Sequence, residues 1–208
     1  IAYEAFEECM ELEEVIMPDS IKVIGSGAFY NCQRLRNVTM SENLVEIGER
    51  AFLDCEYLEN IFLKNNVKII DEYAFAGCDC LTNVIMSEGV EKIEPNAFAY
   101  CKKLNSINIP NSVEKIGYHA FRSCENLKSV QLPRNLKKIA RNSFYRCYKL
   151  EKIQLPTGLN RLDINLFSTH GFLLSNPTYD SDRFSSLKWI TAEEGVFENL
   201  DDYSKYIS

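Results

Sequence analysis

The fold is decided by residues 35–55, which read LRNVTMSENLVEIGERAFLDC. Residues 58–78 repeat this pattern as LENIFLKNNVKIIDEYAFAGC, 23 positions further along the chain. Phenylalanine and cysteine keep the same period at Phe6, Phe29, Phe52, Phe75, Phe98, Phe121, Phe144 and Phe167, and at Cys9, Cys32, Cys55, Cys78, Cys101, Cys124 and Cys147. One such unit cannot bury its own apolar face, so a fixed period of this length indicates stacked coils, that is, a solenoid.

Each coil divides into a strand and a return leg. Leu35-x-x-Val38-x-Met40 alternates apolar and polar positions around a β-branched centre, which predicts a short half-buried strand. Equivalent strands of stacked coils form a parallel sheet with a spacing of about 4.8 Å. The return leg Ile47-Gly48-x-x-Ala51-Phe52-x-x-Cys55 spaces its apolar residues by three or four, which predicts an extended step followed by a helical or 3₁₀ turn.

This pattern resembles the leucine-rich repeat, and more closely its 23-residue BspA-type subclass, over residues 1–167. The resemblance implies an α/β-type repeat solenoid with a parallel β-sheet on its concave face and short helical or 3₁₀ turns on the return legs. It also implies a non-catalytic protein- or glycan-binding module, extracellular or displayed on the cell surface and engaged in adhesion. The alternatives are an intracellular scaffold and an accessory binding module of a larger multidomain protein.

Two segments are expected along the chain. Residues 1–167 form the solenoid, with seven full strand positions and a start in the middle of a repeat. That start suggests a fragment with repeats upstream, whose first coil could associate end to end with another copy. Residues 168–208 leave the period and are predicted to cap the stack, with an eighth strand at 187–192 and a short helix over 193–206.

The sequence carries no recognisable catalytic, cofactor or metal motif. The cysteine column is linear and does not converge as zinc ligands must, so we expect a ladder of buried free thiols. Cys80 lies outside the ladder and is the thiol expected to be exposed and reactive. His119 and His170 replace ordinary repeat residues and have no nucleophile in register with them. We therefore expect no enzymatic activity, cofactor or metal, and no apolar run is long enough to insert into a membrane.

Two surfaces are candidates for ligand binding. The polar positions of the strand pattern should face outward on the concave sheet, where apolar residues are edged by amides. These positions are Ile16, Asn37, Thr39, Asn60, Phe62, Asn83, Ile85, Asn108, Gln131 and Gln154. The other interpretation is that β-branched and aromatic residues simply favour strands, and that Asn side chains pair along the ladder.

The second surface follows from the charge distribution. The net charge of −7 disfavours nucleic acid, but residues 1–101 hold 7 basic and 19 acidic side chains, whereas residues 102–154 hold 12 basic and 3 acidic ones. A basic patch there could attract an acidic protein, a sulfated glycan or a phosphate-rich polymer, unless it is only a solvated face. Its members are Lys102, Lys103, Lys115, Arg122, Lys128, Lys137, Lys138, Arg141, Arg146 and Lys149.

Overall fold

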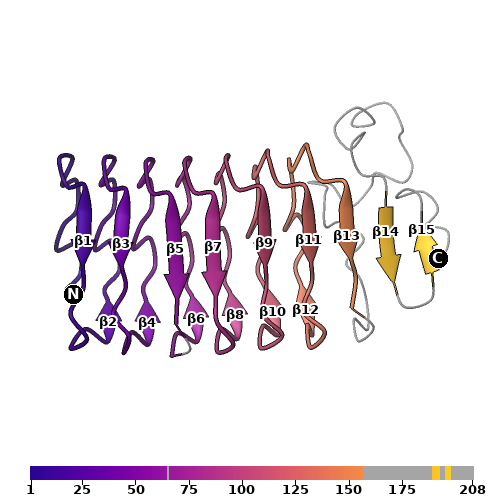
Figure 1. Cartoon of the computed structure of the whole chain (residues 1–208), viewed down its shortest axis with the longest axis horizontal. Helices are drawn as coiled ribbons and strands as arrows, with labels where there is room; N and C mark the ends of the chain where they lie inside the picture. The colour runs from indigo at the N-terminus through magenta and orange to yellow at the C-terminus, as the bar shows by residue number, and fades with distance from the viewer. Residues whose placement is uncertain (65, 157–188, 193–194, 198–208) are drawn as a thin grey trace.

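The computed structural model is a parallel β-solenoid, and it describes residues 1–64, 66–156, 189–192 and 195–197. The longer strand of each coil lies side by side with its equivalents along the long axis of the molecule (Figure 1). These strands are β1 (Glu14–Ile16), β3 (Asn37–Thr39), β5 (Asn60–Leu63), β7 (Asn83–Met86), β9 (Ser106–Asn108), β11 (Ser129–Gln131) and β13 (Lys152–Gln154).

A second parallel sheet is built from a two-residue strand in each return leg. Its members are β2 (Val23–Ile24), β4 (Glu46–Ile47), β6 (Ile69–Ile70), β8 (Lys92–Ile93), β10 (Lys115–Ile116) and β12 (Lys138–Ile139). Partners in both sheets are 23 residues apart, for example Val130 with Ile107 and Ile116 with Ile93. The sequence period is therefore the hydrogen-bonding register.

Beyond β13 the sheet gains β14 (Trp189–Ala192), which pairs in parallel with β13, and β15 (Gly195–Phe197), which pairs antiparallel with β14. The strand β14 falls within the segment predicted as an eighth strand. The helix predicted over 193–206 is wrong at Gly195–Phe197, which is a strand. The other residues of the predicted cap, together with Phe167 and His170, lie outside the described residues.

Stacked phenylalanines fill the centre of the coil. Adjacent rings from Phe6 to Phe144 are stacked with centroids 5.1–5.6 Å apart and planes within 11° of each other. All of these rings except the partly exposed Phe6 are completely buried. Each ring inside the stack therefore packs against the equivalent rings of both neighbouring coils, so a coil depends on its neighbours for the burial of its phenylalanine.

The cysteine column forms a hydrogen-bonded ladder beside these rings. From Cys32 to Cys147, each Sγ donates to the carbonyl oxygen of the phenylalanine in the preceding coil, over 3.0–3.3 Å. All eight cysteines are free thiols. Burial raises the pKa of Cys32 to about 11, and it raises the pKa of Cys55 well above its ordinary value. Cys32 and Cys55 thus stay protonated at neutral pH, and each donates its thiol hydrogen to a backbone carbonyl.

The predicted α/β class, with short helical or 3₁₀ turns on the return legs, is wrong. The described residues contain no helix of either type. The reason is that each return leg has two residues with a left-handed backbone, such as Gly27 (φ +63°) and Asn31 (φ +57°), which cannot continue a right-handed helix. Non-glycine residues occupy the same columns elsewhere, including Arg50 and Tyr73.

The backbone hydrogen bonds of the return leg show what replaces the helix. The amides of Gly27, Phe29 and Asn31 donate to carbonyls of the next coil, while the amides between them donate to carbonyls three residues back. An α-helix would direct every amide four residues back within its own coil. Here every second amide donates a hydrogen bond to the next coil. The return leg is therefore a series of tight turns, and hydrogen bonds between coils hold it in place, as they do in a β-sheet.

Candidate functional site

The predicted concave-surface residues form two rows on the exposed side of the long strands. In the first row, Ile16 pairs with Thr39 and Phe62 with Ile85, and the row continues through Asn108 and two glutamines. The second row runs alongside it through Asn37, Asn60 and Asn83. Only Asn60 is half-buried; the others are exposed. The structure thus brings all ten residues together on one surface, which we call the long-strand face.

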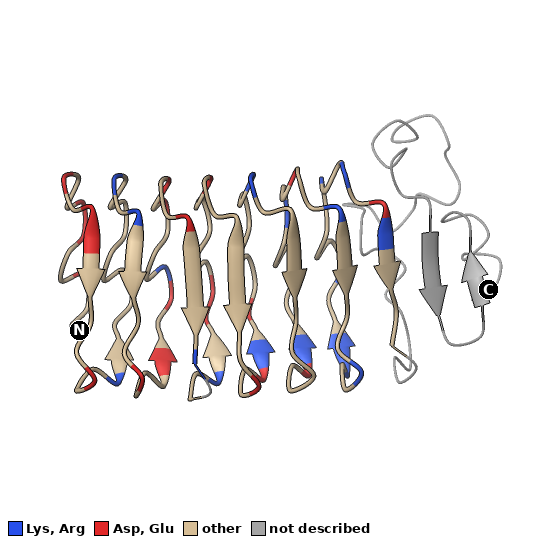
Figure 2. Cartoon of the chain, viewed as in Figure 1, with Lys and Arg blue, Asp and Glu red and all other residues tan. Residues whose placement is uncertain are grey.

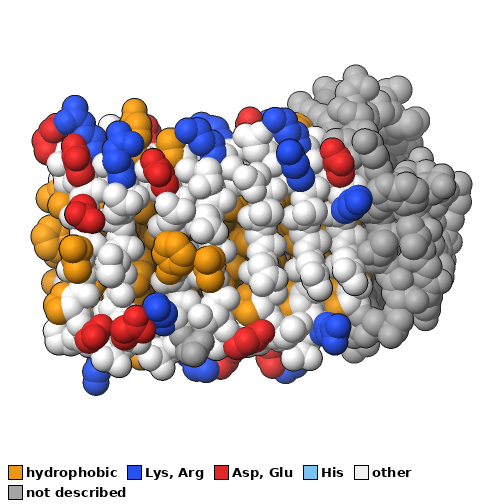
Figure 3. Space-filling model, viewed as in Figure 1, with side chains coloured by type: hydrophobic (Ala, Val, Ile, Leu, Met, Phe, Trp, Pro, Cys, Tyr) orange, Lys and Arg blue, Asp and Glu red, His pale blue; other side chains and the backbone are white. Residues whose placement is uncertain are grey.

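The first row changes character along the solenoid. Its N-terminal part exposes large apolar side chains, with Ile16 70%, Phe62 45% and Ile85 48% exposed. Figure 3 shows hydrophobic (orange) side chains over β1, β5 and β7, whereas the side chains over β9, β11 and β13 are mostly white. The polar end consists of Asn108, Gln131 and Gln154. Apolar contact surface is therefore concentrated on one half of the face.

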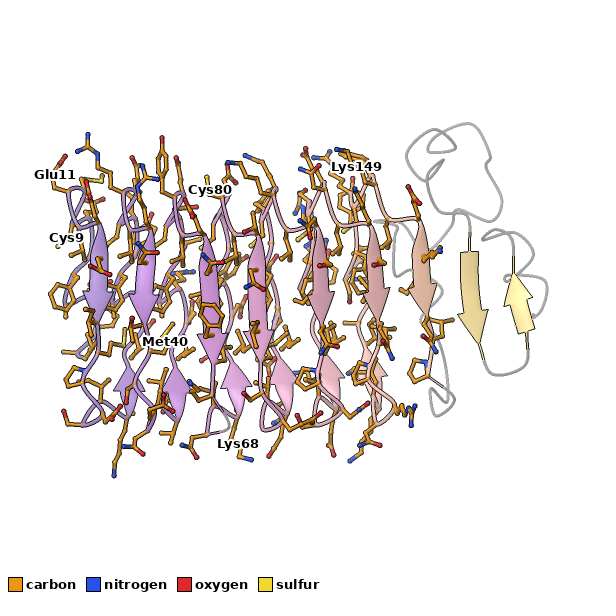
Figure 4. All side chains as sticks on the ribbon, in the orientation of Figure 1. Cys9, Glu11, Met40, Lys68, Cys80 and Lys149 are labelled. Atoms are coloured by element: carbon orange, nitrogen blue, oxygen red, sulfur yellow. The ribbon has the colours of Figure 1, made fainter. Side chains whose placement is uncertain are left out.

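A groove of about 400 Å³ crosses this apolar half. The strands β3 and β5 are not paired with each other in the described sheets, so the surface opens where the ladder is interrupted. The buried Val38 and Met40 also line it; Figure 4 labels Met40 at the lower end of β3. The complete lining is Glu14, Asn37, Val38, Thr39, Met40, Glu42, Asn60, Phe62 and Lys64.

The groove includes two residues that the strand pattern did not single out. Lys64 and Glu42 follow the strands β5 and β3, and their side chains form an ion pair of 3.1 Å. Lys64 and Glu42 are 22 residues apart, so inspection at a spacing of 22–24 residues could have found this pair of opposite charges. A ligand in the groove would meet Phe62, amide side chains and this ion pair together.

The predicted basic patch does not form one surface. Lys102, Lys115 and Lys137 are each neutralised by a carboxylate of the preceding coil at 2.7 Å, namely Asp79, Glu94 and Glu114. Lys149 donates to Asn126 and Lys103 to the sulfur of Cys80. Lys138 lies in β12, and Lys128 is exposed just before β11. Figure 2 shows blue both on the short strands β8, β10 and β12 and on the loops at the opposite edge.

Three members of that patch do come together, in the turns of the return legs. Arg122, Arg141 and Arg146 lie next to tyrosine rings: the Arg122 Cζ is 5.3 Å from the Tyr100 centroid, and the Arg141 Cζ is 5.7 Å from the Tyr118 centroid. In the described part of the chain none of the three is in an ion pair. They differ in this respect from the paired lysines.

His119 is buried in the same turns. The residue is 7% exposed, and its ring stacks on Tyr118 with centroids 3.7 Å apart. Burial, together with the positive charges of Arg122 and Arg141, lowers the pKa of His119 to about 4. The imidazole is therefore neutral at pH 7 and serves as a packing element between the tyrosine rings.

We expect acidification to destabilise the chain through His119. The pKa is lower in the folded chain than its ordinary value of about 6.5, so the unfolded chain binds more protons, and stability is lost as the pH falls from about 6.5 toward 4. Solvent screening limits the loss to about 2 kcal/mol. Urea unfolding at pH 7 and pH 4.5 measures it. The His119→Asn variant is the control, because asparagine tolerates the positive φ of this position. An equal loss of stability in both chains would contradict the assignment.

Cys80 differs from the ladder cysteines in its surroundings. It lies at the upper edge in Figure 4, is half-buried, and accepts a hydrogen bond from the Lys103 ammonium 3.3 Å from its sulfur. Because Cys80 is partly exposed, its sulfur is accessible to reagents that do not reach the buried thiols of the ladder.

We expect iodoacetamide at pH 8 to modify two cysteines of the native chain, Cys80 and the half-buried Cys9, and all eight in urea. Intact-mass spectrometry counts the additions, and the Cys80→Ser variant should lose one of the two. Modification of Cys55 or Cys78 without denaturant, or an unmodified Cys80, would show that the thiol environments are assigned wrongly.

The described residues contain neither a cluster of metal ligands nor a helix suited to a membrane. No group of three or more His, Cys, Asp or Glu side chains there could hold a metal ion. Within the same residues, no helix has the length and apolar character needed to cross a membrane.

Comparisons with known proteins identify the type of repeat. A family model described as BspA type leucine rich repeat region matches in six copies, over residues 1–106 and 91–199. No curated protein sequence is significantly similar to the chain.

Three of the solved structures that are similar to this chain illustrate the likeness. The leucine-rich repeat protein from Eubacterium ventriosum has a TM-score of 0.64 and 23% identity, and the match covers 70% of this chain and 40% of that one. The leucine-rich repeat protein from Bacteroides ovatus has a TM-score of 0.57 and 23% identity, with 76% of this chain and 54% of that one covered. The leucine-rich repeat protein from T. pallidum has a TM-score of 0.58 and 24% identity, with 88% of this chain and 71% of that one covered. The chain thus spans about half the length of the first two structures, and at these identities the likeness concerns the fold.

Proposed function

Because the chain belongs to the BspA-type leucine-rich repeat family, we propose that it is a non-catalytic binding module that engages a protein ligand through the long-strand face. The main observation in support of this proposal is the exposed apolar row of Ile16, Phe62 and Ile85 beside the groove. In protein interfaces a few exposed apolar anchors, aromatic ones above all, supply most of the affinity, and polar groups around them set the orientation.

The composition of the face favours a protein over a glycan as its ligand. Phe62 forms one wall of a groove of about 400 Å³, which is enough for a few side chains of a bound segment. The asparagine row and the Lys64–Glu42 ion pair supply donors and acceptors at its rim. A glycan would need several aromatic faces along its path, but Phe62 is the one aromatic residue in the first row.

A selection experiment tests this proposal without a known ligand. Random twelve-residue peptides displayed on phage are selected on the unmodified chain, and their affinities are measured for two double variants. We expect Phe62→Ser/Ile85→Ser to weaken binding at least tenfold, because it removes both anchors. The matched control Gln131→Ser/Gln154→Ser changes the polar end of the same row and should keep the affinity within threefold.

Two results would contradict the proposal. One is a failure to enrich any peptide, or enrichment of peptides that bind both double variants equally. The other is a glycan-array signal that disappears in Phe62→Ser/Ile85→Ser, which would assign the face to carbohydrate.

We propose in addition that the module is displayed at the cell surface. The support is the resemblance to surface-displayed repeat proteins; among solved structures of the same fold is the pneumococcal vaccine antigen PcpA, with a TM-score of 0.54 and 22% identity. Protease treatment of intact producing cells should release fragments of this chain, whereas an intracellular scaffold would be protected.

A further inference from the structure

The return-leg turns of three successive coils gather arginine and tyrosine side chains into one cluster. Tyr100 comes from one coil, Tyr118 and Arg122 from the next, and Arg141, Tyr145 and Arg146 from the third. We call these six residues the arginine–tyrosine cluster. It is distinct from the long-strand face, because its residues lie in the turns and not in the strands.

The cluster is held together by stacking of guanidinium groups on rings. The Arg122 Cζ lies 5.3 Å from the Tyr100 centroid and 5.6 Å from that of Tyr145, so Arg122 is in contact range of both rings. The Arg146 Cζ lies 5.2 Å from the Tyr145 centroid. Two guanidinium groups on adjacent coils are thereby fixed in place before any ligand arrives, which reduces the entropy lost on binding.

The positive charge of this cluster is not neutralised within the described residues. Arg122, Arg141 and Arg146 have no carboxylate partner there, although three lysines of the same half of the chain are paired at 2.7 Å. The Nε atoms of Arg122 and Arg146 are buried without a hydrogen-bond partner. A guanidinium presents planar, paired donors that match the oxygens of a sulfate or phosphate group.

The length of a matching anion is limited by the N-terminal coils. The columns that hold Arg122, Arg141 and Arg146 hold Glu7, Glu49, Glu72, Glu8 and Asp54 in earlier coils. An extended polyanion along the turns would meet these carboxylates and be repelled. The favourable stretch covers three coils, or roughly 15 Å at the usual strand spacing.

We propose that the arginine–tyrosine cluster is a binding site for a short sulfated oligosaccharide. The arginines bind the sulfate groups, and Tyr100 and Tyr118, which are 38% and 36% exposed, offer apolar surface to the sugar rings. A nucleic acid fits less well because its charge is continuous and the chain carries a net charge of −7. This site is independent of the protein ligand proposed for the long-strand face.

Calorimetry with a fully sulfated heparin-derived tetrasaccharide, whose length matches the three-coil stretch, tests the site. We expect saturable binding that weakens as NaCl is raised from about 50 to about 300 mM, because salt screens the charges. The Arg122→Gln/Arg146→Gln variant should bind at least tenfold more weakly. The matched control Lys102→Gln/Lys137→Gln removes the same charge from paired lysines and should change the affinity less than threefold.

A conservative variant tests whether binding requires the geometry of the guanidinium groups or only their positive charge. Arg122→Lys/Arg146→Lys keeps both charges but loses the planar donors and the stacking, so we expect at least a fivefold loss. Urea unfolding determines whether the glutamine variant is folded. If it is not, the lysine variant alone tests the site. The proposal is overturned if the oligosaccharide does not bind, or if Lys102→Gln/Lys137→Gln loses as much affinity as Arg122→Gln/Arg146→Gln. It is also overturned if Arg122→Lys/Arg146→Lys binds as well as the unmodified chain. Equal or tighter binding of oligothymidylate or of a polyglutamate peptide would likewise contradict it.

Discussion

Replacing Phe75 with alanine is expected to lower the free energy of unfolding by about 3–5 kcal/mol. The Phe75 ring is completely buried and stacks on Phe52 and Phe98 with centroids 5.3 and 5.4 Å away. Its removal leaves a cavity between two coils that are fixed in register by both sheets, so the neighbouring rings cannot close the gap. The loss should fall on the whole solenoid, because the stacking is continuous.

Equilibrium unfolding in urea measures this loss, and Phe62→Ala is the matched control. The same chemical change at Phe62 removes a ring that is 45% exposed on the long-strand face, so we expect a change of less than about 1 kcal/mol. Losses of similar size at the two positions would contradict the assignment of Phe75 to the core and Phe62 to the ligand-binding surface.

Deletion of residues 93–115 is expected to leave a folded, shorter solenoid. The 23 residues are one complete period, and their removal brings Ile116 into the column of its register partner Ile93. Phe121 then stacks on Phe75, and the thiol of Cys124 reaches the Phe75 carbonyl in place of that of Phe98. We expect cooperative unfolding with a smaller dependence on urea, since one coil less is exposed on unfolding.

Deletion of residues 93–114 is the control for this experiment. It differs by a single residue and leaves Lys115 in the fully buried column of Ile93, unless a bulge disrupts the second sheet. We expect this chain to have no cooperative unfolding transition. Equal stability of the two deletion variants would mean that the 23-residue period does not set the register.

The repeat made much of this structure predictable. The alternation in Leu35-x-x-Val38-x-Met40 predicts the strands, and the constant period predicts that Phe62 lies beside Ile85, as it does in the structure. A solenoid has this property because its long-range contacts all have the same sequence separation. The outward row of the long-strand face could therefore be named residue by residue.

The return leg could not be predicted in the same way. Its apolar spacing is that of a helical turn, and the left-handed residues that exclude a helix include Arg50, Tyr73 and Tyr100, which have no preference for that conformation. Stacking hydrogen bonds, which are not visible in a single coil, hold these residues there. Local propensity was overridden by contacts with neighbouring coils.

The arginine–tyrosine cluster also escaped prediction as a unit. Arg122 and Tyr145 occupy the same column one period apart, but Arg122 and Tyr100 are 22 residues apart and occupy different columns. Charge counting grouped the arginines with lysines that carboxylates of the preceding coil neutralise. Whether two charged side chains of adjacent coils form an ion pair depends on their length and direction, which the amino-acid composition does not reveal.

Hydrogen–deuterium exchange with a selected peptide bound tests most directly whether the long-strand face is the ligand-binding surface. We expect added protection at β3, β5 and β7, whose amides lie beneath the groove and the apolar row, and no change in the return-leg turns around Arg122. Protection that appears in those turns while β3, β5 and β7 remain unchanged would contradict this account.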